Sequence, residues 1–352
     1  MFEPIAIIAH SGIFPGGAND AETLYSAIND KKILLDDVRE HFQRVNLEWV
    51  LAKEGLTKDR TWGKKGGYIH NFEQFIHPDE IDFNQIEFLK LDRIYQWLLF
   101  LWSRIRKQLN EKTLSGLDEH TAIILGNLAF PTISLSKIYE HLWLTKNKIT
   151  PYFSLPEAMN RFQSGLPAQL LADVIHVNPY TAYCIEAACA SSLFAIKGAC
   201  DYLQANIVNV AIAGGISCYD DLYIHMGFAA LNALSKSGQS RPLDKRADGL
   251  IPAEGAGIIV LKRLQDALDN DDTIYGIIRG ASTSNEGKGK GYLVPSEVSQ
   301  TKTIKSAYEL SGIDPASISW IEVHATGTPV GDTKELISMA EVFKHDLDIG
   351  AN

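Results

Sequence analysis

The stretch from residue 181 to residue 203 places a cysteine between a strand and a helix. A β-rich run, Thr181 to Ile185, enters small residues around Cys189, and apolar residues then recur at helical spacing, at Leu193, Ile196, Cys200 and Leu203. A helix start lowers a thiol's pKa, and its unpaired N–H groups can hold an oxyanion. The small neighbours leave room for an acyl group, so the pattern suits acyl transfer through a thioester. A lone cysteine among alanines is also a common core residue, and this window alone favours that interpretation.

Composition narrows the class of protein. The chain has 352 residues, enough for two domains or one large duplicated domain, and its 45% hydrophobic content is typical of a globular protein with a sizeable core. A net charge of −10 without a long basic run argues against nucleic acid and anionic membranes as partners. The apolar stretch 94–102 is too short to span a bilayer, and residues 1–4 do not resemble a signal peptide.

The four cysteines show neither disulfide nor metal-site spacing. They are Cys184, Cys189, Cys200 and Cys218. A reducing compartment is the simplest setting for them, so we expect a cytoplasmic protein.

Apolar runs and helical patterns alternate along the chain, which indicates an α/β fold. Strands are expected at residues 5–9, 121–126, 207–213, 258–261, 273–278 and 318–323. Helices are expected at 21–29, 86–107, 162–171, 298–311 and 333–343, with no strand after the last of them. Residues 31–79 are irregular and mixed in charge, which is typical of surface loops.

Two loops carry candidate polar side chains. Residues 234–257 are rich in Gly, Pro, Asp and Ser, and their charged residues either act in catalysis or hold the loop together: Arg241, Asp244, Arg246, Asp248 and Glu254. His324 ends a strand and precedes two threonines in a glycine-containing loop, a pattern that fits either a site or a structural histidine. The run GKGKG at 287–291 lacks the order of a phosphate-binding loop, which excludes an NTPase.

Several motifs, in the right order, resemble those of β-ketoacyl synthases. AACASS around Cys189 and VHATGTPVGD with His324 are similar to the family's nucleophile and first-histidine motifs. Segment 5–17 resembles the family's first strand and loop, and segment 237–257 resembles its central loop. Segment 287–300 resembles the stretch that precedes the helix of its second half. The resemblance covers nearly the whole chain and is weak at 31–117. The motif variants are most similar to synthases of polyketide and polyunsaturated-fatty-acid multienzymes.

The resemblance implies a thiolase-type fold, layered αβαβα from two similar halves, in a homodimer. Residues 1–264 would form the N-terminal half with Cys189, and residues 265–352 the start of a truncated C-terminal half with His324. The implied activity is an acyltransferase that joins a Cys-bound acyl chain to a malonyl-type extender by decarboxylative condensation. Both substrates would travel on the phosphopantetheine of an acyl carrier protein, and no bound cofactor or metal is implied.

The family pattern also assigns roles to individual residues. Cys189 would be the nucleophile and its N–H an oxyanion donor, while His324 would polarise the malonyl thioester. Thr326 and Thr328 would bind the pantetheine amides. The net negative charge of the chain does not suit an acidic carrier protein, so a local basic patch would have to bind it. Lys288 and Lys290 either belong to such a patch or are solvated loop lysines.

The chain also departs from the family pattern. The second histidine, the lysine before it and a C-terminal glycine-rich strand are absent from the sequence. We therefore expect a fragment of a longer synthase, or a split protein completed by a partner chain. Either way, the isolated chain is expected to condense inefficiently, which an assay of carbon–carbon bond formation tests. Ala325 and Ala190 replace a common glycine and serine without removing a reacting atom.

Other function classes remain open on sequence grounds. A non-condensing partner subunit, like a chain-length factor, would share the fold but usually lacks the cysteine. A thiolase or starter synthase that uses coenzyme A, and a binding module on the same scaffold, are further alternatives. Covalent acylation of Cys189 that iodoacetamide blocks would separate the catalytic classes from the others.

Overall fold

The apolar runs of the sequence meet in a central sheet. The structure, a computed structural model, describes residues 2–38, 47–53, 59–76, 81, 83–288, 294–345 and 348–351. Within these ranges, six strands lie in the order β5-β4-β6-β7-β1-β8. Their bounds are β1 Ile5–Ile13, β4 Thr121–Asn127, β5 Ala182–Ile185, β6 Val210–Ser217, β7 Gly255–Arg263 and β8 Gly276–Ile278. Strands β5, β4 and β6 are parallel, whereas β7 runs antiparallel to both β6 and β1, and β8 antiparallel to β1.

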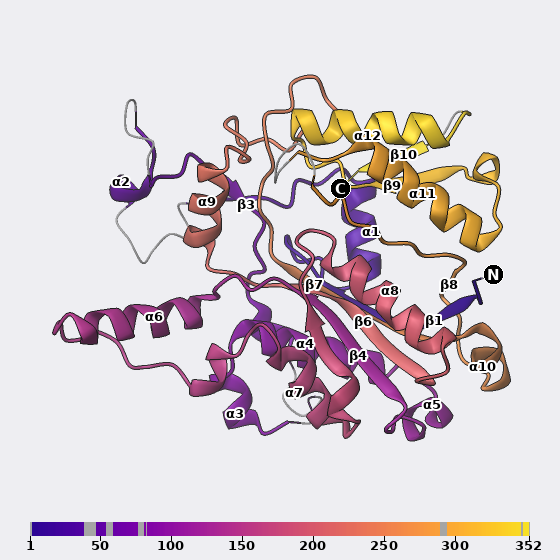
Figure 1. The fold of residues 1–352 in the computed structure, drawn as a ribbon. Coiled ribbons are helices and arrows are strands. Elements are labelled where there is room, and N and C mark those ends of the chain that lie inside the picture. Colours follow the sequence, from indigo (N-terminus) through magenta and orange to yellow (C-terminus); the bar gives the residue numbers. More distant parts are fainter. Residues whose placement is uncertain are drawn as a thin grey trace.

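Helices cover both faces of this sheet (Figure 1). Helix α8, Ser191–Gln204, packs on β4 and β6, and α4, Arg93–Arg106, and α7, Leu166–Ile175, pack on the opposite face. Two hydrophobic clusters result, one on each side of the sheet. Nearly all side chains of α4 are buried, as the continuous apolar run of its sequence predicts.

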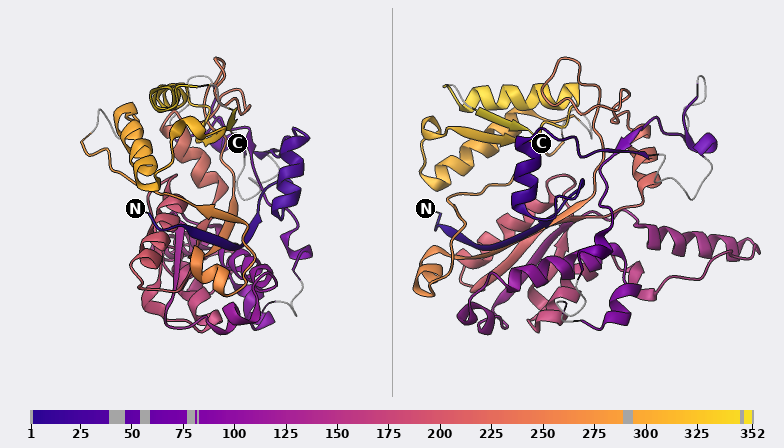
Figure 2. Two further views of the ribbon diagram at one scale, coloured as in Figure 1. Left: turned by 90° about the vertical axis from the view of Figure 1, so that its right-hand side faces the viewer. Right: turned by 180° about the vertical axis from the view of Figure 1, so that it is seen from behind.

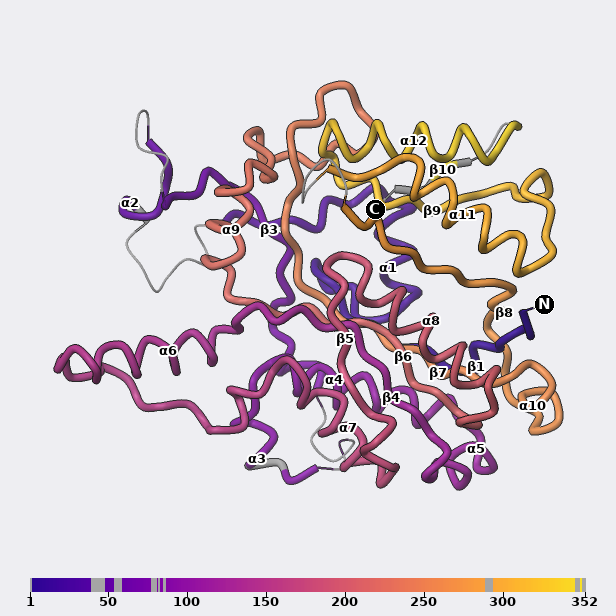
Figure 3. The backbone as a smooth tube through the Cα atoms, viewed as in Figure 1, coloured from indigo at the N-terminus to yellow at the C-terminus, as the bar shows by residue number. Residues whose placement is uncertain are grey.

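A second, smaller unit lies beyond α8 (Figures 1 and 3). It contains β9, Trp320–Val323, paired in parallel with β10, Asp348–Ala351, and the helices α11, Glu297–Ser311, and α12, Pro329–Val342. Gly312, at a φ of +66°, ends α11 as the sequence predicts. Helices, sheet, helix, small sheet and helices thus follow one another, which is the expected layered thiolase-type arrangement.

The remaining elements are short or peripheral. They are α1 Ala21–Asn29, β2 Asp36–Asp37, α2 Leu47–Val50, β3 Lys65–Gly66, α3 Gln85–Lys90, α5 Glu111–Ser115, α6 Ile133–Lys146, α9 Asp221–Ala230 and α10 Leu264–Asp269, with 3-10 turns at Phe72–Gln74, Ala158–Arg161, Pro179–Thr181 and Pro315–Ser317. Helix α6 projects away from the body of the molecule (Figure 2). Among the described residues, no helix is both long and apolar enough to cross a membrane.

Local patterns mispredicted some elements. The expected helix 86–107 is two helices, because Asp92 caps α4 through the N–H of Ile94 at 3.4 Å and is held by the hydroxyl of Thr132 at 2.5 Å. The expected helix 162–171 begins only at Leu166, after a turn. Strand β10 was not expected at all.

The expected face of α8 was partly wrong. Leu193, which helical spacing groups with Cys200 and Leu203, is 66% exposed, whereas Cys200 and Leu203 are buried. The inward positions near the helix start are taken by Ser191 and Ala195. Small side chains therefore fill the space where α8 meets the sheet.

A buried ion pair joins β7 to the loop before β8. Lys262 Nζ lies 2.8 Å from Asp272 Oδ2, and these side chains are 3% and 2% exposed. The other oxygen of Asp272 accepts bonds from Asn110 and Thr113. The carboxylate is thus fully hydrogen-bonded within the protein.

Replacing Asp272 by asparagine is expected to lower the free energy of unfolding by about 3–5 kcal/mol, because it leaves the Lys262 charge buried without its counter-ion. Urea denaturation measures this change. The neighbouring Asp271→Asn variant is the matched control. Asp271 meets Lys112 at 3.6 Å on the surface, where a pair contributes at most about 1 kcal/mol. Equal losses in both variants would contradict the prediction.

Candidate active site

Cys189 lies in the turn between β5 and α8, two residues before the helix begins. This is the strand-to-helix position that the sequence predicts. Ala188 has a φ of +50°, a left-handed conformation that side-chain-bearing residues rarely adopt. The turn fits closely against the sheet, since a Cβ on Gly126 of β4 would approach the backbone of Ser191 and Ser192 to 2.5 Å. The sheet thereby fixes where the helix start, and with it the cysteine, can lie.

His324 follows β9 in a loop whose backbone is held by α12. Both carboxylate oxygens of Glu335 accept backbone N–H groups, one from His324 and one from Ala325, each at 2.8 Å. Ala325 is buried and has a φ of +35°. Asp332 accepts the N–H of Gly327 at 3.1 Å and that of Leu243 at 2.8 Å, which ties the histidine loop to the loop before β7.

The structure brings the side chains of Cys189 and His324 together. The interaction between them is the largest cause that lowers the pKa of the thiol and the largest that raises the pKa of the imidazole. The two shifts bring the pKa values of the thiol and the imidazole closer together, which is the direction that favours a thiolate. Both side chains are exposed, so the sulfur is open to a substrate.

The other three cysteines lack this activation. Burial raises the pKa of Cys184 to about 11 and that of Cys200 to about 12, and it raises the pKa of Cys218 well above its usual value. At neutral pH these thiols stay protonated and unreactive. Of the four thiols, Cys189 alone has a lowered pKa.

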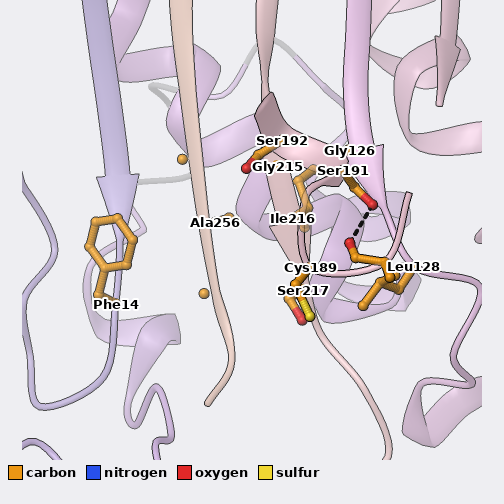
Figure 4. Close-up of a pocket in the computed structure, with 13 residues that line it drawn as sticks. Phe14, Gly126, Leu128, Cys189, Ser191, Ser192, Gly215, Ile216, Ser217 and Ala256 are labelled. Carbon is orange, nitrogen blue, oxygen red and sulfur yellow. Dashed lines mark hydrogen bonds between the residues drawn. The ribbon is translucent and has the colours of Figure 1, made fainter. Parts of the chain in front are cut away.

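A cavity of about 400 Å³ lies beside Cys189 (Figure 4). Strands β6 and β7 contribute small residues to its wall, and Phe14 and Leu128 add apolar surface; the lining is Phe14, Gly126, Leu128, Ala188, Cys189, Ser191, Ser192, Gly215, Ile216, Ser217, Gly255, Ala256 and Gly257. Such a mixed, mostly apolar wall suits an acyl chain held next to the sulfur. Ala190, expected to help make this room, lines a different cavity between α8, α11 and α12.

The predicted pantetheine-binding threonines lie together in the histidine loop. The hydroxyl oxygens of Thr326 and Thr328 are 2.9 Å apart, and both residues are partly buried. Neither of them lines the cavity at Cys189. Between them, Gly327 accepts the N–H of Gly249 at 3.0 Å, so the loop 234–257 packs directly against them.

The charged residues of the loop 234–257 hold it together. Asp248 accepts bonds from Ser235 and Ser237, and Asp244 pairs with Arg246 at 2.6 Å. Glu254 is buried and accepts the N–H of Ile69 at 2.6 Å. These bonds support the second of the two interpretations that the sequence left open, and none of the five candidate residues of this loop lines the cavity at Cys189.

The basic residues near 290 are only partly described. Lys288 is exposed, which fits either a patch or a solvated lysine, and Lys290 lies outside the described residues. In the ranges that the structure describes, no group of His, Cys, Asp or Glu side chains could hold a metal ion.

Sequence reasoning missed Glu335 and Asp332, the carboxylates that shape the histidine loop. Both carboxylates lie in the helix that directly follows the His324 loop, and this position could have predicted that they bind the backbone of the loop. Replacing Glu335 by glutamine is expected to lower the free energy of unfolding by about 1–3 kcal/mol, because the amide NH₂ cannot accept the second N–H. Hydrogen exchange at the amides of His324 and Ala325 should speed up as well.

The matched control for this change is Glu341→Gln on the same helix. Glu341 is 59% exposed and only pairs with surface lysines. That variant should leave both amides protected. Unchanged exchange in Glu335→Gln would contradict the role that we give to the carboxylate.

Comparisons with known proteins fit this geometry. A family model described as "Beta-ketoacyl synthase, N-terminal domain" matches residues 2–267, and one described as "Beta-ketoacyl synthase, C-terminal domain" matches residues 275–351. The chain is 29% identical to "Polyketide synthase PksN" of Bacillus subtilis over 97% of its length, and 42% identical to "5-methylorsellinic acid synthase" of Aspergillus terreus over 45% of its length. It spans 6% of each of these relatives.

Solved structures show the same fold. The structure titled "PfaC Keto synthase-Chain length factor" superposes with a TM-score of 0.88 at 30% identity, covering 99% of this chain and 39% of that one. A ketosynthase from module 6 of the bacillaene synthase of Bacillus subtilis superposes with a TM-score of 0.77 at 26% identity, covering 99% of this chain and 57% of that one.

Proposed function

This chain belongs to the β-ketoacyl synthase family, and from that premise we propose that it is an acyltransferase of polyketide or fatty-acid biosynthesis. It joins a Cys189-bound acyl chain to a malonyl-type extender by decarboxylative condensation. The observation that carries the proposal is the proximity of Cys189, in the wall of a mostly apolar cavity, to His324, whose imidazole is the main cause that lowers the pKa of the thiol. We assign the nucleophile to a half formed by residues 1–264, and His324 to a half that begins at residue 265.

The first step is acyl loading. The Cys189 thiolate attacks the carbonyl carbon of an acyl thioester on the phosphopantetheine of an acyl carrier protein. A bond forms between the Cys189 sulfur and the carbonyl carbon, and the bond between that carbon and the pantetheine sulfur breaks. The pantetheine sulfur keeps the electron pair of the broken bond and takes the proton that His324 holds. The developing oxyanion meets N–H groups at the start of α8. The cavity then holds the acyl chain, and Thr326 and Thr328 bond the pantetheine amides.

Loading also prepares His324 for the second step. Its pKa is raised first by the bond to Cys189, while burial lowers it. An acylated sulfur is neutral and cannot supply that stabilisation, so the imidazole becomes neutral more readily. A neutral imidazole can donate its N–H to the malonyl thioester oxygen. The carboxylate then leaves as carbon dioxide, and its electron pair forms an enolate whose carbon attacks the acyl-cysteine and releases the thiolate.

A second copy of the chain is the proposed partner besides the carrier protein. Helix α6 projects from the body and exposes apolar side chains along its length: Ile133, Tyr139, Leu142 and Trp143. Strand β5 is an open edge of the sheet next to Tyr180, which is 92% exposed. Exposed apolar surface and open strand edges both favour association. Analytical ultracentrifugation tests this: a wild-type chain that sediments as a monomer at micromolar concentration would refute it.

A chain-length-factor-like partner subunit is the second candidate function. The name of the PfaC structure, which superposes over 99% of this chain, contains that term. Such a subunit would not need an activated cysteine, whereas Cys189 is exposed and has a lowered pKa. We therefore keep the condensing enzyme as the first candidate. The four cysteines are unpaired, which suits the cytoplasm.

The decisive experiment measures carbon–carbon bond formation. The chain is incubated with an acyl-pantetheine and a malonyl-pantetheine thioester, each also supplied on an acyl carrier protein, and products are detected by mass spectrometry. A β-ketoacyl product that requires both substrates supports the condensing enzyme. Acyl-Cys189 with little or no β-ketoacyl product would agree with the inefficient condensation that the sequence predicts for the isolated chain, and would support acyl loading alone. No covalent adduct would favour the partner subunit.

A further inference from the structure

The turn that holds Cys189 is closed by one side chain. The hydroxyl oxygen of Ser191 accepts the N–H of Ala187 at 2.9 Å and donates to the carbonyl of Ala188 at 2.6 Å, the bond drawn in Figure 4. The backbone N–H of Ser191 donates to the same carbonyl at 3.1 Å. These three bonds bracket Ala188, the residue in the left-handed conformation directly before the cysteine.

The position of Ser191 is itself fixed by the sheet. Its side chain is 5% exposed, and its backbone packs on Gly126 of β4, where any Cβ would clash at 2.5 Å. Ser192 is held in the same way against Gly215 of β6, with a Cβ distance of 2.9 Å. The hydroxyl therefore links the rigid junction of sheet and helix to the backbone that carries the sulfur.

We propose that Ser191 is a positioning residue, whose hydroxyl holds the Cys189 turn so that the sulfur meets His324. The inference rests on the proposed function, in which this pair is the reacting centre. Alanine at 191 leaves the Ala187 N–H without its acceptor and allows Ala188 to relax to an ordinary conformation. The sulfur then moves away from the imidazole, whose interaction with it is the main cause that lowers the pKa of the thiol.

A purely structural serine would act differently. Ser191 is the first residue of α8, and a hydroxyl at a helix start can contribute to stability alone. Ser296 offers the matched comparison, because it caps α11 by accepting the N–H of Ser299 at 3.3 Å and lies far along the chain from the cysteine turn. Loss of either hydroxyl should reduce the melting temperature, but only loss of the Ser191 hydroxyl should change the pKa of the Cys189 thiol.

The test follows the rate at which iodoacetamide alkylates Cys189 in the full-length chain, resolved by peptide mass spectrometry as a function of pH. In Ser191→Ala the midpoint is expected to rise by about one pH unit, so alkylation well below the midpoint slows about tenfold. Ser191→Thr retains a hydroxyl and should restore the wild-type midpoint. Ser296→Ala should leave it unchanged.

The same measurement distinguishes a failure of the positioning role from a failure of the proposed function. A wild-type midpoint near that of an ordinary thiol would refute the activated nucleophile itself. A low wild-type midpoint that is unchanged in Ser191→Ala would overturn only the positioning role. Should Ser191→Ala fail to fold, Ser191→Cys keeps the side-chain shape with a weak donor and acceptor. A midpoint in that variant equal to wild type would also overturn the inference.

Discussion

Replacing Cys189 by alanine is expected to abolish acyl transfer to the protein, with a loss of at least about 1,000-fold in the loading rate. No second thiol can take its place, because burial raises the pKa of Cys184, Cys200 and Cys218. The fold should persist, since Cys189 is exposed and alanine keeps the backbone of the turn. Mass spectrometry after incubation with an acyl-pantetheine thioester measures the adduct, and circular dichroism checks the fold.

Cys184 provides the matched control for this experiment. It lies on β5, five residues before the nucleophile, and desolvation of this partly buried thiol raises its pKa to about 11. Cys184→Ala should load acyl groups at the wild-type rate. An adduct that persists in Cys189→Ala, or that maps to position 184 in the wild-type chain, would remove the nucleophile from the mechanism proposed above.

The strand and helix on either side of Cys189 could be predicted from the sequence because their signals are local. The alternation of residues 181–185 and the helical spacing after them need no distant contact. The break before α4 could not be predicted in this way. It depends on Asp92, whose carboxylate accepts the hydroxyl of Thr132, forty residues further along the chain. The spacing of apolar residues cannot predict that contact.

The candidate site shows the same division. That Cys189 and His324 belong together was implied by the family resemblance, not by any periodicity, since they lie on different units of the fold. The support from Glu335 was missed because a carboxylate that binds its own loop backbone looks like any helix-surface glutamate in the sequence. Likewise, helical spacing alone did not reveal that Leu193 is exposed while Ser191 and Ala195 are buried.

Replacing His324 by alanine is expected to impair both steps through different effects. The interaction with the imidazole is the largest cause that lowers the Cys189 pKa, whereas desolvation by the surrounding protein raises it. Without the imidazole, this desolvation remains, so the thiol pKa rises and the pH midpoint of Cys189 alkylation moves upward. At a pH above the new midpoint, loading should therefore recover, because the thiolate forms without assistance.

Decarboxylation should not recover at high pH in this variant. The N–H donor that stabilises the enolate oxygen is absent at every pH, and loss of such a donor slows the step by about 100- to 1,000-fold. Carbon dioxide released from a malonyl thioester by acyl-loaded enzyme measures it. His345→Ala is the control, since that ring binds the carbonyl of Ile318 at 2.7 Å instead. Undiminished carbon dioxide release from His324→Ala would assign decarboxylation to another group.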